Sequence, residues 1–202
     1  MLDFKFWMNS TFKIKHSKFK NITMDNLLDK YLFQALDAYP YDLQETVESL
    51  QYALSYNPNS TRALCLMGQV YAEQLKDYET AKAYYQEALS ENMNAIGVYE
   101  HYINVLLWNE DFAEAEKLIN FAFTIKGMDK AILYVKKAQL FEQKRKYKLA
   151  LKHLKKAKEY SFNNGFIDFI TEEQTRIKNK LPKKKSSKKP SKKSKKKKKQ
   201  YN

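Results

Sequence analysis

A hydrophobic pattern recurs along the chain every 34 or 35 residues, and it constrains the fold more than any other feature. The segments that carry it are DLQETVESLQYAL, DYETAKAYYQEAL, DFAEAEKLINFAF and KYKLALKHLKKAK. Large and small side chains align in four columns: Leu43, Tyr78, Phe112 and Tyr147; Thr46, Ala81, Ala115 and Ala150; Leu50, Tyr85, Ile119 and Leu154; Ala53, Ala88, Ala122 and Ala157. A fixed period of this length indicates repeats that stack on one another.

The spacing within each segment predicts a helix. The columns fall at positions i, i+3, i+7 and i+10, which form one stripe of an amphipathic helix. Small residues on the stripe let a neighbouring helix approach closely, and large ones fill the space beside the contact. A second helical pattern precedes each segment, most clearly at Leu64, Met67, Gly68 and Tyr71. Each unit is therefore predicted to be a helix, a short turn and another helix.

The composition supports the same conclusion. With four Gly and four Pro in 202 residues, it favours long helices over a turn-rich β architecture.

These patterns resemble the tetratricopeptide repeat family over roughly residues 26–164. The family pattern is matched best at Leu64, Met67, Gly68, Tyr71, Ala81, Tyr85 and Ala88, with Pro58 as the closing Pro of the first unit. The chain departs from the pattern where Met93, Gly127 and Phe162 replace Pro. The resemblance implies an all-α fold, a right-handed superhelical solenoid of about four helix-turn-helix repeats at about 26–60, 61–95, 96–129 and 130–164.

The ends of the chain are expected to differ from the repeats. A capping helix is predicted at 166–181, because Phe166, Phe169, Ile170 and Ile177 share one face and the last repeat of a solenoid needs a polar outer surface. The helical domain then spans 24–181. Residues 1–23 are a basic extension, disordered or outside the fold, and Met24 is an alternative start. Residues 182–202 contain 12 Lys and no acid, a composition that predicts disorder.

No arrangement of residues in the sequence indicates catalysis. His16, His101 and His153 are scattered, without partners at metal-ligand spacing, and the four Gly are isolated rather than gathered in a phosphate-binding loop. We therefore expect no enzyme activity, no cofactor and no metal.

The one cysteine, Cys65, excludes an internal disulfide and fits a reducing compartment. No apolar run approaches the roughly 18 residues of a membrane span, so a cytoplasmic location is expected, or a nuclear one in a eukaryote.

The resemblance also indicates where a partner would bind. In the family, the first helix of each repeat lines a concave groove with the face opposite the packing stripe. In this chain that face would carry Lys30, Gln34, Asp37, Arg62, Cys65, Gln69, Glu73, Glu100, His101, Asn104, Trp108, Tyr134, Ala138 and Glu142. Trp108 is the first candidate anchor and Tyr134 the second, since Trp and Tyr bury a large area at low entropic cost. Packing of Trp108 against the neighbouring inter-helix turn is the alternative. The acidic members favour a neutral or basic protein or peptide segment.

Charge divides the chain into regions. Residues 24–129 have 6 basic and 17 acidic side chains, whereas residues 130–181 have 14 basic and 5 acidic ones. The tail adds candidate polyanion contacts at Lys183, Lys184, Lys185, Lys188, Lys189, Lys192, Lys193, Lys195, Lys196, Lys197, Lys198 and Lys199. Such asymmetry indicates electrostatic interactions, although an AT-rich coding bias also produces Lys.

Two functions follow from these features. The first is a scaffold that binds a protein or peptide segment in the groove, with electrostatic contacts from the tail. The alternative is an accessory factor of RNA or ribosomes whose tail binds nucleic acid without sequence preference. The tail could also contact its own acidic repeats, or serve only for solubility or localisation.

Overall fold

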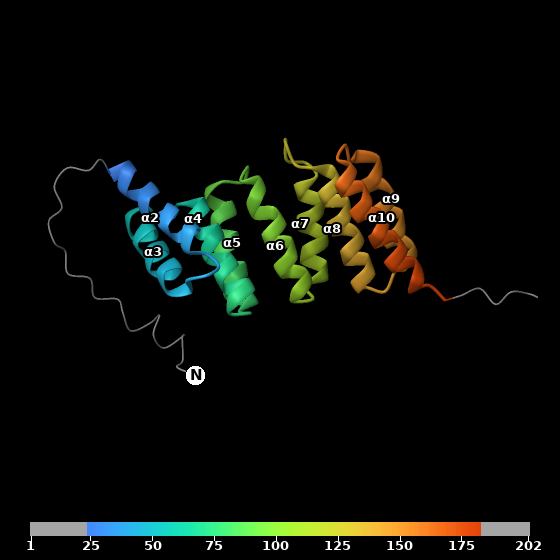
Figure 1. The fold of residues 1–202 in the computed structure, drawn as a ribbon, viewed down its shortest axis with the longest axis horizontal. Coiled ribbons are helices and arrows are strands. Elements are labelled where there is room, and N and C mark those ends of the chain that lie inside the picture. Colours follow the sequence, from blue (N-terminus) through green and yellow to red (C-terminus); the bar gives the residue numbers. More distant parts are fainter. Residues whose placement is uncertain (1–23, 183–202) are drawn as a thin grey trace, which may run out of the picture. The chain divides into compact units, whose positions relative to one another are not determined.

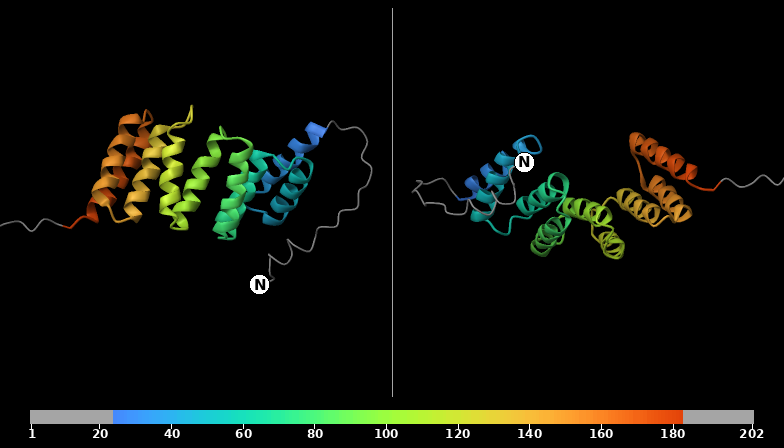
Figure 2. Two further views of the ribbon diagram at one scale, coloured as in Figure 1. Left: turned by 180° about the vertical axis from the view of Figure 1, so that it is seen from behind. Right: turned by 90° about the horizontal axis from the view of Figure 1, so that it is seen from below.

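The computed structural model describes residues 24–182, with side chains from residue 30 onward, in two compact units divided after Met128. The first unit contains α2 (Met24–Ala38), α3 (Leu43–Tyr56), α4 (Thr61–Gln69), a π-helical turn (Val70–Gln74), α5 (Tyr78–Glu91), α6 (Ile96–Trp108) and α7 (Phe112–Ala122). The second contains α8 (Lys130–Gln143), α9 (Tyr147–Tyr160) and α10 (Asn164–Asn179). Within each unit, consecutive helices pack side by side (Figures 1 and 2). Residues 24–182 contain no strand, which confirms the all-α prediction.

The repeat columns form the core of both units. All members of the second, third and fourth columns, from Thr46 in α3 to Ala157 in α9, are 2 % exposed or less. The first column, which begins with Leu43, is only half-buried because it lies at the start of each second helix. Thr46 is the one polar member of the buried columns, and its hydroxyl donates a hydrogen bond to the carbonyl of Asp42 (2.6 Å). The sequence stripe therefore corresponds to the packed face of each second helix.

The turns between the two helices of the second, third and fourth repeats each contain one residue with a positive φ. Lys76, Glu110 and Arg145 each adopt a positive φ, at 55°, 61° and 55°. At Glu110 the helix end is closed by a Schellman-type bond, in which the amide of Asp111 donates to the carbonyl of Leu106 (2.8 Å). A single left-handed residue thus reverses the chain, the next residue is the N-cap, and the second helix begins directly after it.

In the second repeat, the first helix ends in the π-helical turn Val70–Gln74, where the amide of Leu75 donates to the carbonyl of Val70 (3.2 Å). A π turn accommodates one additional residue in a helix without breaking it. The turn therefore takes up one residue of the 35-residue spacing between Leu43 and Tyr78.

In the second unit, α10 packs on α9. Ile170 and Ile177 of α10 are buried together with Ala150, Leu154 and Ala157 of α9. The helix begins at Asn164, two residues before the predicted start, because the side chain of Asn163 accepts a hydrogen bond from the amide of Phe166 (3.0 Å) and caps the first turn.

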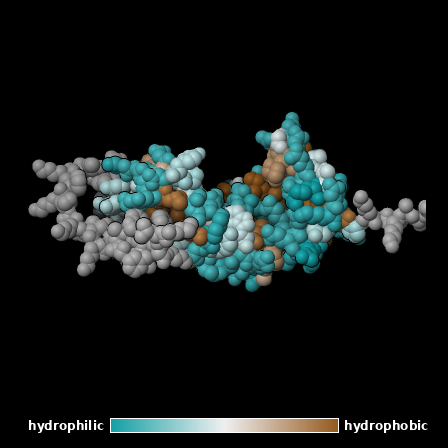
Figure 3. Space-filling view, turned by 60° about the horizontal axis from the view of Figure 1, so that its bottom comes forward, coloured by the Kyte–Doolittle hydropathy of each residue, from teal (hydrophilic) through white to brown (hydrophobic). Residues whose placement is uncertain are grey.

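The face shown in Figure 3 is mainly polar, with apolar patches among the polar side chains. No helix in residues 24–182 has both the length and the apolar character needed to cross a lipid bilayer.

Candidate functional site

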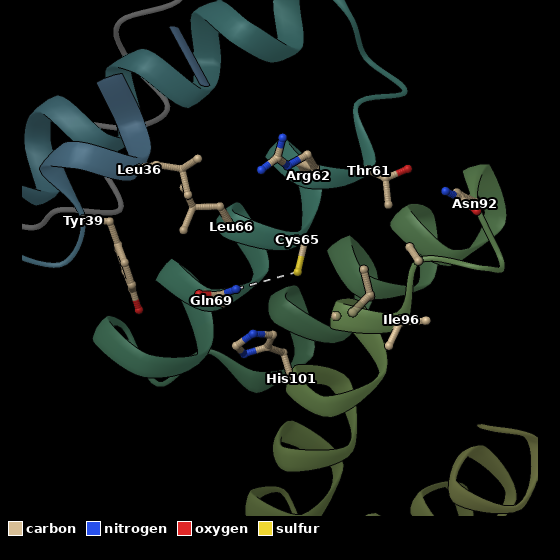
Figure 4. Close-up of a pocket in the computed structure, with 13 residues that line it drawn as sticks. Leu36, Tyr39, Thr61, Arg62, Cys65, Leu66, Gln69, Asn92, Ile96 and His101 are labelled. Carbon is tan, nitrogen blue, oxygen red and sulfur yellow. Dashed lines mark hydrogen bonds between the residues drawn. The ribbon is translucent and has the colours of Figure 1, made fainter. Parts of the chain in front are cut away.

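A cavity of about 530 Å³ opens in the first unit, between the end of α2, the length of α4 and the start of α6 (Figure 4). Its volume lies within the usual range of ligand pockets, about 300–1,000 Å³. The residues that line it are Leu36, Tyr39, Thr61, Arg62, Cys65, Leu66, Gln69, Asn92, Ala95, Ile96, Gly97, Val98 and His101. The first helices of three consecutive repeats therefore contribute to one cavity.

Helix geometry explains how α4 contributes to this site. Leu64 and Met67 are buried in the core, whereas Arg62, Cys65 and Gln69 follow one another at i, i+3 and i+7 and line the cavity. The helix thus has a packing face and a face that lines the cavity.

The cavity wall combines apolar side chains with neutral polar ones. Leu36 on α2 and Ile96 on α6 line it while keeping 40 % and 42 % of their surface exposed. Asn92, Gln69 and Thr61 supply amide and hydroxyl groups. No carboxylate is among the lining residues, which include the guanidinium of Arg62. Such a wall suits a ligand with an apolar group and hydrogen-bonding groups beside it.

Cys65 lies in the cavity wall and keeps its proton at neutral pH. Burial raises the pKa of the thiol, and the hydrogen bond donated by Gln69 Nε2 to Sγ (3.7 Å) opposes that rise only in part. The cavity therefore presents a neutral thiol rather than a reactive thiolate.

Glu73, which was predicted to face the groove, is engaged at the edge of the site. The hydroxyl of Tyr39 donates a hydrogen bond to Glu73 Oε2 (2.5 Å). Burial, reinforced by this bond to a carboxylate, raises the pKa of Tyr39 to about 12. The pair links the end of α2 to the π-helical turn and leaves Glu73 outside the cavity lining.

The structure brings together four of the predicted groove residues, Arg62, Cys65, Gln69 and His101. The other predicted residues on α2 and α6 lie outside the cavity lining: Lys30, Gln34, Asp37, Glu100, Asn104 and Trp108. Trp108 ends α6 with 46 % of its surface exposed, and its ring lies tilted against Tyr78, with centroids 6.2 Å apart. A role of these residues in partner binding stays a prediction.

Predicted residues in the second unit are held by other contacts. Tyr134 packs its ring against His153 and Tyr160, with centroid distances of 6.2 and 5.4 Å. Glu142 accepts hydrogen bonds from Arg176 (2.6 and 2.7 Å) and Lys180 (2.7 Å) of the segment that closes the unit. The tail lysines and the N-terminal extension lie outside the described residues.

Sequence reasoning missed the apolar contributors Leu36, Leu66 and Ile96. Leu36 follows Leu32 by four residues, so the pattern assigns both to the core, but only Leu32 is buried. No local pattern separates the two, because both occupy the same face of α2 and only packing against other helices decides which is covered. In residues 24–182 no three His, Cys, Asp or Glu side chains are arranged to hold a metal ion.

Comparison with known proteins agrees with this architecture. The tetratricopeptide repeat model matches residues 61–92 and 131–164. No curated protein sequence matches the chain.

Similar solved structures include PilF of Pseudomonas aeruginosa, with a TM-score of 0.66 and 16% identity over 79% of this chain and 72% of that one. MamA of Desulfovibrio magneticus RS-1 has a TM-score of 0.58 and 16% identity over 78% and 92% of the two chains. An O-GlcNAc transferase of Thermobaculum terrenum has a TM-score of 0.54 and 16% identity over 67% of this chain, which spans only 27% of that enzyme. At this identity the likeness concerns the fold. The two matched segments, together with the repeat period, show that the chain contains tetratricopeptide repeats.

Proposed function

We propose that the chain is a non-enzymatic scaffold that holds a short segment of a partner protein in the cavity of the first unit. The observation that carries the proposal is the placement of Leu36 and Ile96, two exposed apolar side chains from different repeats, on the wall of one open cavity. Apolar surface of this kind, surrounded by polar groups, is typical of binding sites for proteins and peptides.

The lining defines the chemistry of the segment. One or two apolar side chains of the ligand would be buried against Leu36, Leu66 and Ile96. Amide and hydroxyl groups of Asn92, Gln69 and Thr61 would satisfy the backbone of an extended peptide. Since residues 24–128 carry 6 basic and 16 acidic side chains, basic residues flanking a neutral anchor would add long-range attraction. We therefore propose that the ligand segment has a neutral anchor residue, which enters the cavity, and basic residues on either side of it.

Cys65 provides a direct test, because it is the only cysteine of the chain and lies in the cavity wall. Peptides would be selected from a random phage-displayed library on the immobilised full-length chain and then synthesised. A peptide that fills the cavity is expected to slow the reaction of Cys65 with N-ethylmaleimide in a saturable manner.

Matched substitutions on α2 locate the site independently of the thiol. Leu36→Asp places a charge on the cavity wall and is expected to weaken peptide binding at least about tenfold, or about 1.4 kcal/mol. Phe33→Asp is the control, since Phe33 is 53 % exposed on the same helix and does not line the cavity. Equal affinity for both variants, or peptides that bind without protecting Cys65, would contradict the proposal.

A further inference from the structure

The outer face of α9 in the second unit carries a row of lysines. Lys148, Lys152 and Lys155 are spaced at i, i+4 and i+7, and all three are exposed. They lie opposite the buried stripe that contains Ala150, Leu154 and Ala157. We call Lys148, Lys152 and Lys155 the α9 lysine face.

This face lacks the neutralising partners that other lysines have. Within residues 24–182, the structure shows no ion pair for any member of the α9 lysine face. By contrast, Lys82 on α5 pairs with Glu79 (2.8 Å) and Asp111 (2.7 Å). The stretch 144–160 contains eight Lys or Arg residues and a single acid, Glu159. The positive charge of α9 is therefore not balanced locally.

The charge also opposes the stability of the helix that carries it. Like charges at i, i+4 cost an isolated helix about 0.2–0.5 kcal/mol per pair. The residue before the second helix is Asp42, Asp77 and Asp111 in the first three repeats, but Lys146 in the fourth. Asp42 and Asp77 make side-chain cap bonds, whereas Asp111 and Lys146 make none, and Lys146 alone adds a positive charge at this position. A bound polyanion would offset this repulsion between the lysines of α9.

We propose that the α9 lysine face docks the phosphate backbone of a single-stranded nucleic acid. The row extends about 10 Å along the helix at 1.5 Å per residue, which is enough to meet about three successive phosphates. An acidic protein partner would need an apolar or aromatic anchor at the centre of the contact, and a membrane surface would need large apolar side chains to insert. The exposed large apolar side chains of α9 are Leu149, next to Lys148, and Tyr160, at the end of the helix, so the lysine face has one apolar neighbour rather than an apolar centre. Backbone contacts to phosphate require only cations.

The sequence beyond the face has the same sign of charge. Residues 129–202 contain 26 basic side chains against 6 acidic ones, because the twelve tail lysines follow the folded part of this unit. A polymer of phosphates is long enough to meet both regions. The inference is independent of the peptide cavity, which lies in the first unit.

The test isolates the folded face from the tail. All variants are full-length chains in which the twelve tail lysines are replaced by Gln. The probe is a fluorescein-labelled 20-nucleotide polyuridine RNA, and binding is followed by fluorescence anisotropy at several salt concentrations. The combined change Lys148→Gln, Lys152→Gln and Lys155→Gln is expected to weaken binding at least about tenfold. The slope of log K against log salt should fall by about 2, at about 0.7 for each lost contact.

The control variant removes the same charge from the first unit through Lys76→Gln, Lys117→Gln and Lys126→Gln, three exposed positions. It should leave the salt slope unchanged, and circular dichroism verifies that both triple variants fold. An equal loss in the control, or no RNA binding once the tail lysines are gone, overturns the proposal. Displacement of the RNA by polyglutamate, or by vesicles containing phosphatidylserine, at equal charge concentration also overturns it, because the face would then bind any polyanion.

Discussion

Gly68 in α4 lies directly against the ring of Tyr85 in α5. A Cβ atom at this position would lie 2.7 Å from Tyr85 Cε1, which is closer than real Cβ contacts allow. Tyr85 is 1 % exposed, so its ring has little room to move. Gly97 in α6 differs, since a Cβ there would meet no atom within 4 Å. A side chain at Gly68 would therefore clash with Tyr85, whereas a side chain at Gly97 would meet open space.

Gly68→Ala is expected to lower the free energy of unfolding by about 1–2 kcal/mol, because the cost of overpacking exceeds the gain in helix propensity. Gly97→Ala should raise it by about 0.5–1 kcal/mol, since Ala favours the helix and meets open space. Urea unfolding followed by circular dichroism measures both values. A stabilised Gly68→Ala variant would mean that α4 and α5 leave room for a methyl group between Gly68 and Tyr85.

At the scale of the element, the second helices differ in how they begin. Asp42 caps α3 by accepting a hydrogen bond from the amide of Glu45 (2.9 Å). Asp77 does the same in α5 for the amide of Thr80 (3.3 Å). Asp111 before α7 and Lys146 before α9 occupy the equivalent position and make no such bond. Asp111 instead accepts hydrogen bonds from Lys82 and Asn109, whereas Lys146 has no carboxylate to cap with. Its positive charge also lies near the positive end of the helix dipole.

Lys146→Asp is therefore expected to stabilise α9 by about 0.5–1 kcal/mol, through a capping bond and a favourable interaction with the dipole. Asp42→Ala is the converse variant and should cost about 1 kcal/mol. Hydrogen exchange of peptides covering 147–160, measured by mass spectrometry, reports the change at α9 itself. Unaltered exchange in the Lys146→Asp variant would mean that the cap does not form.

The contact between α8 and α10 depends on the charge of Glu142. Burial alone would raise the pKa of Glu142, but hydrogen bonds from Arg176 and Lys180 outweigh burial and lower it. A carboxylate with a lowered pKa in the folded state contributes stability above its ordinary pKa, and this stability is lost as the pH falls through and below that value.

The second unit should accordingly lose stability as the pH is lowered through about 4.3, the ordinary pKa of Glu. Glu142→Gln should cost about 1 kcal/mol at pH 7, a modest value because Arg176 is partly exposed, and should weaken the pH dependence. Hydrogen exchange of peptides from 164–179 at pH 7 and pH 4, corrected for intrinsic rates, measures both effects. An unchanged pH response in the variant would assign the dependence to other carboxylates.

At the scale of the whole molecule, the charge boundary coincides with the boundary between the two units. Residues 24–128 have 6 basic and 16 acidic side chains, and residues 129–182 have 14 and 6. Each unit therefore carries a large charge of one sign, and self-repulsion of this kind destabilises a compact state. Salt screens the repulsion, because the Debye length falls to about 10 Å at 0.1 M.

Raising NaCl from 20 to 300 mM should therefore raise the midpoint of thermal unfolding, by roughly 2–4 °C for each 1 kcal/mol gained. Circular dichroism at 222 nm provides the measurement, with the Gln variant of the α9 lysine face as the matched control. That variant should gain less from salt, since part of its repulsion is already removed. A midpoint that falls with salt would instead show that ion pairs such as Lys82 with Asp111 dominate.

The local period of the chain determines much of the fold. The columns through Thr46, Leu50 and Ala53 predict amphipathic helices and their buried faces, because helix geometry alone decides which side chains share a stripe. The cavity face of α4, with Arg62 and Gln69, is predicted by the same reasoning.

Only the tertiary structure shows how side chains from different helices meet. It places Leu36 and Ile96 on one cavity wall, and it pairs Glu142 with Arg176 across 34 residues. The close approach of Gly68 to Tyr85 also depends on the packing of α4 against α5. The sequence by itself therefore determined the helices, their buried stripes and the reversal of charge along the chain. The cavity and its apolar wall depend on how α2, α4 and α6 are placed relative to one another, and no local pattern encodes that placement.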